Sequence, residues 1–204
     1  MSFYEDHILP HLIGCACATP QIMKQRSLLV PAATGRVLEI GFGSGTNLGF
    51  YDPVKVDHLF ALEPSVGMRR KAAKAVAASP LDISWLDLPG EDIPLDDNSV
   101  DTVVLTYTAC TIPDAALALK QMRRVLKPGG QLLFSEHGLS PDDRVAKWQR
   151  RIEPVWKHLA GGCHLTRQPD QMITQAGFKI DRLTKDYLPK APRFAAYNYA
   201  GCAQ

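Results

Sequence analysis

The sequence predicts an α/β fold in which a doubly wound, mostly parallel sheet carries helices on both faces. Short apolar runs of strand character alternate with helical stretches along the chain. These runs are apolar throughout, which is typical of strands buried on both faces. The 204 residues, 46% of them hydrophobic, suffice for one domain with a sizeable core.

Strands are expected where apolar runs are bounded by turn residues. Such runs occupy residues 36–40, 59–62, 83–86, 101–106, 131–135, 178–181 and 197–202. The run 131–135 directly follows Pro128-Gly129-Gly130, which separates it from the preceding helical stretch. A sheet of seven strands is therefore expected.

Helices are expected between these strands. Ser65 can cap a helix that runs to residue 78, and Asp114 can cap a helix that ends before Pro128. Another helix is expected over residues 142–159, where Pro154 should break or kink it. Residues 1–30 have the pattern of helices that precede the sheet.

Charge and cysteine content restrict the class of protein. Lys and Arg number 23 against 21 Asp and Glu, and the pI near 8.3 does not imply a broad nucleic-acid-binding face. No stretch of about 18 apolar residues is found, and the N-terminus lacks a signal-peptide pattern. Five cysteines favour reduced thiols in the cytoplasm over a disulfide framework, and Cys15 and Cys17 are too close together for a usual zinc pair.

The strongest chemical signal is a glycine-rich turn after the first strand, with Gly41, Gly43 and Gly45. Glycine is needed where the backbone takes positive φ or approaches a ligand closely, and a helix should follow from Thr46. The dinucleotide pattern G-x-G-x-x-G would need a glycine at Thr46, so it is not met. Glu39 would also repel a diphosphate.

A second acid, Glu63, ends the next strand, 24 residues after Glu39 (63 − 39). An acid about 20 residues beyond such a turn accepts hydrogen bonds from ribose hydroxyls. Pro64, beside it, and Asn47, behind the glycines, are assigned to the same site. This arrangement predicts a nucleoside-binding site but does not distinguish a dinucleotide from S-adenosylmethionine.

Polar residues also end the fourth and fifth strands. Thr106 and Tyr107 should line the cofactor floor or reach the reacting group of the ligand, because ligands bind outside the carboxyl ends of such strands, and Tyr107 is a catalytic candidate. An aromatic face there can hold a cation. Glu136 and His137 end the fifth strand, where His137 could act as a catalytic base or simply hydrogen-bond its flanking segments; the sequence leaves both open.

The spacing E-x-G-x-G-x-G from Glu39 to Gly45 resembles motif I of class I S-adenosylmethionine-dependent methyltransferases. Other segments narrow this resemblance: Gly90-Glu91, Glu136-His137, and the runs 153–158 and 162–167. Together they are similar to the methyltransferase type 11 branch that contains the animal thiol methyltransferases. The resemblance extends from about residue 36 to near the C-terminus.

This resemblance implies a Rossmann-like fold with one methyltransferase domain over residues 1–204 and S-adenosyl-L-methionine as cofactor. Residues 1–30 would cover the cofactor, and residues 141–170 would be an insertion on the substrate side. Within the family, the acid of motif I recognises the amino-acid end of the cofactor, which assigns Glu39. The segment after the third strand covers the adenine, which assigns Gly90 and Glu91, with Asp92 as the alternative acid.

The insertion holds Trp148 and Trp156, which fit either a lid over an apolar acceptor or ordinary core packing. It also holds His158, Cys163 and His164. Their spacing matches no standard zinc pattern, so no metal is expected.

The sequence thus predicts an S-adenosylmethionine-dependent methyltransferase acting on a small, apolar acceptor, with a thiol preferred. The alternatives are a non-catalytic S-adenosylmethionine-binding module, a nucleic-acid methyltransferase and a nicotinamide-dependent oxidoreductase. No nucleic-acid partner is expected. The animal proteins carry a hydrophobic N-terminal anchor that this sequence lacks, so a cytoplasmic location is expected, with peripheral membrane contact left open.

Overall fold

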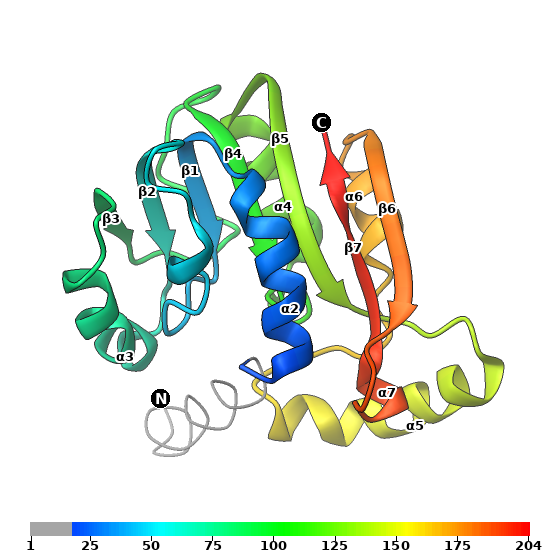
Figure 1. Ribbon diagram of the computed structural model, residues 1–204. Coiled ribbons are helices and arrows are strands. Elements are labelled where there is room, and N and C mark those ends of the chain that lie inside the picture. The colour runs from blue at the N-terminus through cyan, green and yellow to red at the C-terminus, as the bar shows by residue number, and fades with distance from the viewer. Residues whose placement is uncertain (1–17) are drawn as a thin grey trace.

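The computed structural model describes residues 18–204, and a seven-stranded sheet forms its centre (Figure 1). The strands are β1 (Gly35–Ile40), β2 (Val56–Leu62), β3 (Ile83–Leu86), β4 (Val100–Thr106), β5 (Leu126–His137), β6 (Ile180–Tyr187) and β7 (Tyr197–Ala203). Their order across the sheet is β3-β2-β1-β4-β5-β7-β6. Neighbours from β3 to β5 run parallel, whereas β7 is antiparallel to both β5 and β6. The predicted mostly parallel sheet is confirmed.

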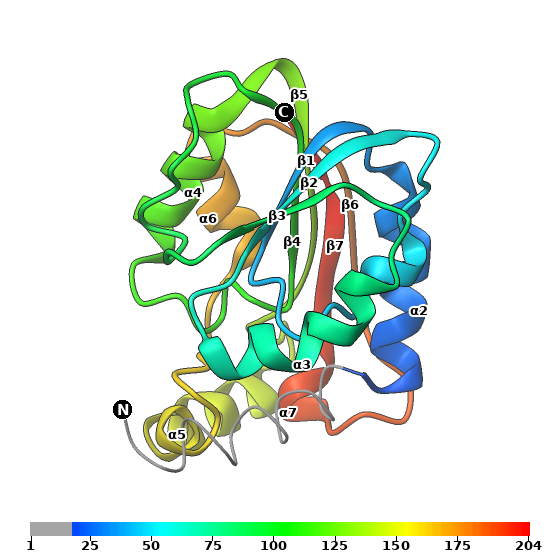
Figure 2. The same cartoon turned by 90° about the vertical axis from the view of Figure 1, so that its left-hand side faces the viewer.

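Helices cover both faces of this sheet. They are α2 (Pro20–Leu29), α3 (Val66–Ala77), α4 (Ala115–Val125), α5 (Asp143–Leu159), α6 (Pro169–Gln175) and α7 (Arg193–Ala196), with the 3₁₀ helices η2 (Val30–Ala32) and η3 (Leu48–Phe50). Figure 2 views the sheet along its edge and shows α4 and α6 on one face and α2 on the other. Two apolar cores result, one including Leu119 of α4 and Ile173 of α6, the other Leu29 of α2 and Ala72 of α3. The doubly wound, Rossmann-like arrangement is therefore confirmed.

Side-chain caps set the start of the three longest helices after the glycine turn. The hydroxyl of Ser65 accepts a hydrogen bond from the backbone N–H of Met68 at 3.3 Å, and Asp114 accepts one from Leu117 at 2.9 Å. Asp142 caps α5 in the same way. These bonds satisfy N–H groups that the first helical turn leaves without partners, so the predicted starts are confirmed.

The helix expected from Thr46 is not found. Residues 43–47 form a turn, and only the three-residue η3 follows. The side chain of Asn47 is hydrogen-bonded to Glu39 and Thr106, which holds the turn against the sheet.

Helix α5 continues through Pro154, so proline does not break the helix, and the alternative of a kink stays a prediction. Proline leaves the carbonyl four residues earlier, that of Arg150, without its helical donor. Both Arg150 and Pro154 are exposed, so water can reach this carbonyl.

Strand β6 begins later and is longer than the predicted run 178–181. It lies at the edge of the sheet and most of its side chains reach solvent. An edge strand of this kind carries polar residues, so a search for continuous apolar runs finds only its start.

Residues 1–17, and with them Cys15, Cys17 and part of the predicted cover, lie outside the described residues. The remainder of that cover is helical, as α2 and η2. Within residues 18–204, none of the helices combines the length and the apolar character that crossing a bilayer requires.

Candidate functional site

The glycine turn lies at the carboxyl end of β1 and touches the segment that follows β4. Gly41, Gly43 and Gly45 have φ angles of 66°, 60° and 79°, in the region that favours glycine. A Cβ on Gly41 would lie 2.3 Å from Cγ2 of Thr108, whereas a Cβ on Gly43 would meet nothing closer than 3.8 Å. The lack of a side chain at Gly41 therefore allows close packing against Thr108, whereas the space beside Gly43 is open.

Glu39 is buried directly beneath this turn, and both of its carboxylate oxygens have donors. The hydroxyl of Tyr51 donates to Oε2 at 2.6 Å, and Nδ2 of Asn47 donates to Oε1 at 2.9 Å. Burial raises the pKa of Glu39 to about 7, against the lowering effect of these bonds and of Arg26. The carboxyl group thus ties η3 to β1, and its contact with the amino-acid end of a ligand stays a prediction.

Arg26 enters the same network from α2. Its Nη1 donates to Oδ1 of Asn47 at 2.8 Å and to Oγ1 of Thr106 at 2.7 Å, and its guanidinium lies 5.3 Å from the centre of the Tyr107 ring. Only 4% of the residue is exposed. Arg26 therefore links the N-terminal helix, the glycine turn and the end of β4.

The pKa of Glu39 gives the first testable prediction. Below its unfolded pKa, near 4.5, the carboxyl group is neutral in both states. Between about pH 4.5 and 7 the carboxyl group is protonated in the folded state and ionised in the unfolded state. The stability that the protonated Glu39 contributes is therefore lost as the pH rises through this range, and the free energy of unfolding does not change further above it. The free energy of unfolding of the ligand-free protein should therefore fall, relative to Glu39→Gln, by at most about 3 kcal/mol. Denaturant unfolding from pH 5 to 8 measures this, and parallel curves would refute the assignment.

Glu63 bridges the glycine turn and the start of α3. Its Oε2 accepts the N–H of Gly43 at 2.8 Å, and its Oε1 accepts that of Ser65 at 2.9 Å. Burial raises the pKa of Glu63 above its ordinary value. The carboxylate thus holds the backbone around the turn, its neighbour Pro64 is exposed, and the contact of Glu63 with a ribose stays a prediction.

Gly90 and Glu91 lie between the ends of β1 and α4. A Cβ on buried Gly90 would lie 3.3 Å from the side chain of Ile112 and 3.6 Å from that of Ile40. Oε1 of Glu91 accepts the N–H of Asp114 at 3.0 Å, while its buried Oε2 has no partner among the described residues. The structure therefore brings this pair to the rim that carries the glycine turn, whereas Asp92 points to solvent.

Tyr107 follows β4 with a φ of 54°, a conformation that costs a non-glycine residue of order 1–3 kcal/mol and often marks a functional site. Ser135 donates a hydrogen bond to its hydroxyl at 3.3 Å. Oε1 of Glu136 accepts the N–H groups of Thr108 and Ala109 at 2.7 and 3.1 Å, and burial raises the pKa of Glu136 to about 7. Glu136 thus shapes the segment after β4 through these two hydrogen bonds.

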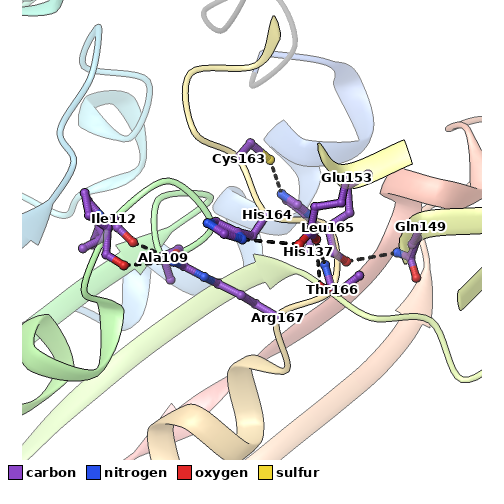
Figure 3. Close-up of polar contacts among 11 residues, drawn as sticks. Ala109, Ile112, His137, Gln149, Glu153, Cys163, His164, Leu165, Thr166 and Arg167 are labelled. Carbon is purple, nitrogen blue, oxygen red and sulfur yellow. Dashed lines mark hydrogen bonds and ion pairs between the residues drawn. The ribbon is translucent and has the colours of Figure 1, made fainter. Parts of the chain in front are cut away.

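His137 contacts a thiol. Its Nε2 lies 3.2 Å from Sγ of Cys163 (Figure 3), while its buried Nδ1 has no partner within residues 18–204. Hydrogen bonds from Cys110 and His137 hold the pKa of the Cys163 thiol well below its ordinary value, and Cys163 in turn raises the pKa of His137 despite its burial. Whether His137 acts as a base stays a prediction.

The two tryptophans of α5 have different surroundings. Trp156 packs edge-on against Phe194 with ring centres 5.4 Å apart, whereas Trp148 is 52% exposed. They line one hollow of about 350 Å³ together with Arg151, Ile152, Val155 and Leu159. This apolar face lies on the insertion that the sequence assigned to the substrate side.

Sequence reasoning missed two residues of this region, Arg26 and Tyr51, and did not place Cys110 beside His137. Arg26 lies in a helix without a clear apolar stripe, and Tyr51 follows Glu39 by 12 residues in an unremarkable loop. No local pattern in the sequence marks either of them. His158, Cys163 and His164, which the sequence analysis did not expect to bind a metal, do not form a ligand group among the described residues: His158 is exposed, and His164 lies 3.4 Å from Glu153.

The fold is the α/β architecture of S-adenosylmethionine-dependent methyltransferases. A family model described as a methyltransferase domain matches residues 38–134. An S-adenosylmethionine-dependent methyltransferase of Leishmania major superposes with a TM-score of 0.70 at 16% identity, covering 98% of this chain and 80% of that one. An S-adenosylmethionine-dependent methyltransferase of Mesorhizobium loti superposes with a TM-score of 0.68 at 17% identity, covering 91% of this chain and 98% of that one.

Sequence relatives place the chain more narrowly. It is 38% identical over 171 residues to the thiol S-methyltransferase TMT1B of Homo sapiens, covering 78% of this chain and 69% of the relative. It is 38% identical over 147 residues to TMT1B of Rattus norvegicus, covering 70% of this chain and 59% of that protein. The chain belongs to the class I S-adenosylmethionine-dependent methyltransferases, in the branch of these thiol S-methyltransferases, and its cofactor is S-adenosyl-L-methionine. It spans less than two thirds of the rat relative's length.

Proposed function

We propose that the protein transfers the methyl group of S-adenosylmethionine to the sulfur of a small, apolar thiol. The observation that carries the donor side is the pair of acids on the glycine turn: Glu39 beneath it and Glu63 bonded to Gly43. Carboxylates suit a ligand with an ammonium group, a sulfonium and ribose hydroxyls, and no phosphate. The likeness to thiol S-methyltransferases supports a thiol as the acceptor.

Within this proposal, each predicted residue takes a place along the cofactor. Glu39 and Asn47 shape the site of the amino-acid end, and Gly41, Gly43 and Gly45 let that end approach the backbone. Glu63 and Pro64 lie beside the ribose, and Gly90 and Glu91 beside the adenine. Thr106 and Tyr107 form the floor under the sulfonium.

Methyl transfer from S-adenosylmethionine requires mainly that the protein align the acceptor with the methyl group. Transfer is an in-line displacement at a carbon that the positive sulfur already activates, so orientation and exclusion of water dominate. A thiol has an ordinary pKa near 8.5 and needs little help to ionise. His137 is the proposed base or positioning group, and the apolar hollow at Trp148 and Trp156 favours an apolar acceptor. A reducing cytoplasm suits such an acceptor and agrees with cysteines 110, 163 and 202, none of which forms a disulfide.

A methyl-transfer screen over thiols, amines, phenols and carboxylates tests this function. We expect thioether formation from apolar thiols and little product from the other classes. Calorimetry should show binding of S-adenosylmethionine and its demethylated product, but not of nicotinamide dinucleotides. Cofactor binding without transfer to any acceptor would favour the non-catalytic module instead.

Glu63→Gln tests the ribose assignment. The change keeps the size of the side chain but removes the charge that strengthens hydrogen bonds to the ribose. Affinity for S-adenosylmethionine should fall by about 1.5–3 kcal/mol, roughly 10- to 100-fold, in calorimetry. Asp57→Asn, an exposed acid near the start of the same strand, is the matched control and should bind normally. Equal affinities for the two variants would remove the assignment.

A further inference from the structure

Three soft metal-binding groups converge where β4 and β5 end. Cys110 follows β4, His137 ends β5, and Cys163 belongs to the segment after α5. Their ligand atoms, two Sγ and one imidazole nitrogen, all lie within 4.8 Å of one another. Both cysteines are buried, 5% and 9% exposed, and Figure 3 shows Cys163 directed toward His137. Three distant parts of the sequence thus supply one compact set of ligands.

The spacing of these atoms is close to that of a tetrahedral zinc site. Zinc lies about 2.3 Å from thiolate sulfur and about 2.0–2.1 Å from imidazole nitrogen, so neighbouring ligand atoms are about 3.5–3.8 Å apart. Here the distance from Nε2 of His137 to Sγ of Cys163 is 3.2 Å, and no pair exceeds 4.8 Å. Side-chain shifts of about 1 Å would therefore complete the geometry.

The backbone that carries the two cysteines is held in place without using their thiols. The N–H of His164 donates to the carbonyl of Cys110 at 2.8 Å, which joins the two segments directly. Arg167 donates to the carbonyl of Ile112 at 2.7 Å and also to that of Ala109 (Figure 3). The two thiols and the imidazole contact one another, so a cation would replace contacts within this trio, at a site that the backbone organises before the cation binds.

We propose that Cys110, His137 and Cys163 bind a zinc ion and leave its fourth position open for the acceptor thiol. Three protein ligands with one open position is the arrangement of catalytic zinc sites. Thiolate and imidazole ligands select zinc over magnesium or calcium. The substrate part of this proposal rests on the proposed function, whereas the metal site itself does not.

The open position gives the metal a defined part in the reaction. The acceptor thiol binds as a thiolate and releases its proton to solvent, so His137 positions the acceptor as a metal ligand and does not act as the base. Its sulfur forms a bond to the methyl carbon while the bond from that carbon to the sulfonium sulfur breaks. The electron pair of the broken bond neutralises the sulfonium, so the products are a neutral thioether and the demethylated cofactor. The thioether is a weaker ligand than a thiolate and leaves.

Metal analysis of the full chain tests the site. The protein is kept reduced with a phosphine, loaded with zinc chloride, freed of excess metal and analysed by mass spectrometry of the elements. We expect one equivalent of zinc, and at least about tenfold weaker zinc binding in Cys110→Ser and in Cys163→Ser. Cys202→Ser, in β7, is the matched control and should bind zinc normally. Uptake by the unaltered protein no greater than by the Cys110→Ser/Cys163→Ser double variant would overturn the proposal.

Cobalt substitution gives a second measurement that does not depend on any variant folding. Cobalt(II) in the site should show the visible absorption of a tetrahedral centre with thiolate ligands, and phenylmethanethiol should change this spectrum. An unchanged spectrum would overturn the open position, and so would a metal-free protein that methylates this thiol as fast as the zinc-loaded one. Neither result would affect the proposed function. Conversely, zinc binding without methylation of any thiol would remove the proposed function and leave the metal site standing.

Discussion

Gly41→Ala should lower the free energy of unfolding by about 2–5 kcal/mol. An alanine at a φ of 66° costs about 1–2 kcal/mol, because its Cβ crowds the following carbonyl. Its Cβ would also lie 2.3 Å from Cγ2 of Thr108, and such overpacking adds about 1–3 kcal/mol. Thr108 cannot easily retreat, since its backbone N–H is bound to Glu136 at 2.7 Å. Denaturant unfolding measures the loss, and calorimetry should show weaker binding of S-adenosylmethionine.

Gly43→Ala is the matched control for this prediction. Gly43 has nearly the same φ, 60°, but no atom within 3.8 Å of the added Cβ, so it should show the backbone cost alone. Combining Gly41→Ala with Thr108→Ala, which removes the two closest atoms, should restore part of the stability. Equal losses for Gly41→Ala and Gly43→Ala would show that the contact with Thr108 contributes nothing.

The sheet and the glycine turn could be predicted because local sequence determines both. Strands β1, β2 and β4 are buried on both faces, so their residues form continuous apolar runs. The turn requires glycine at positions with positive φ, which leaves a visible spacing in the sequence. Edge strand β6 lacks a continuous apolar run because solvent reaches most of its side chains, and its extent was accordingly wrong.

The interior of the site could not be predicted because its contacts join distant residues. Arg26 and Thr106 are 80 positions apart, and His137 and Cys163 are 26 apart. Sequence spacing directed attention to His158 and His164 as neighbours of Cys163, whereas the fold supplies Cys110 and His137 instead. A ligand set assembled from the ends of two strands and a separate segment has no characteristic spacing. The sequence-based expectation of no metal therefore concerned a different group of residues from the one proposed to bind zinc.

Buried charge is the common feature of Glu39 and Arg26, which lie beneath the glycine turn. Glu39 and Arg26 are both almost completely buried, and the attraction between them lowers the pKa of Glu39 against the stronger effect of burial. Asn47 joins the two, donating to Glu39 and accepting from Arg26. Loss of either charge leaves the other without compensation, which is costly inside a protein. The N-terminal helix is thus coupled electrostatically to the glycine turn.

At pH 8, where Glu39 is ionised, Arg26→Met should therefore destabilise the protein by about 3–5 kcal/mol, as expected when one partner of a buried charge pair is removed. The variant loses the bonds to Asn47 and Thr106 and the contact with the Tyr107 ring, and the pKa of Glu39 should rise further. Lys24→Met, an exposed change in the same helix, is the control and should alter stability by less than about 0.5 kcal/mol.

A double-mutant cycle separates the charge effect of Arg26 from its packing. Glu39→Gln removes the buried carboxylate, so Arg26→Met should cost less in that background than in the unaltered protein. We expect a coupling of about 1–3 kcal/mol in denaturant unfolding at pH 8, where Glu39 is ionised. At pH 5 Glu39 is largely protonated, because its pKa is about 7, and the coupling should shrink. A coupling that is equally large at both pH values would contradict the electrostatic explanation and assign the role of Arg26 to its hydrogen bonds alone.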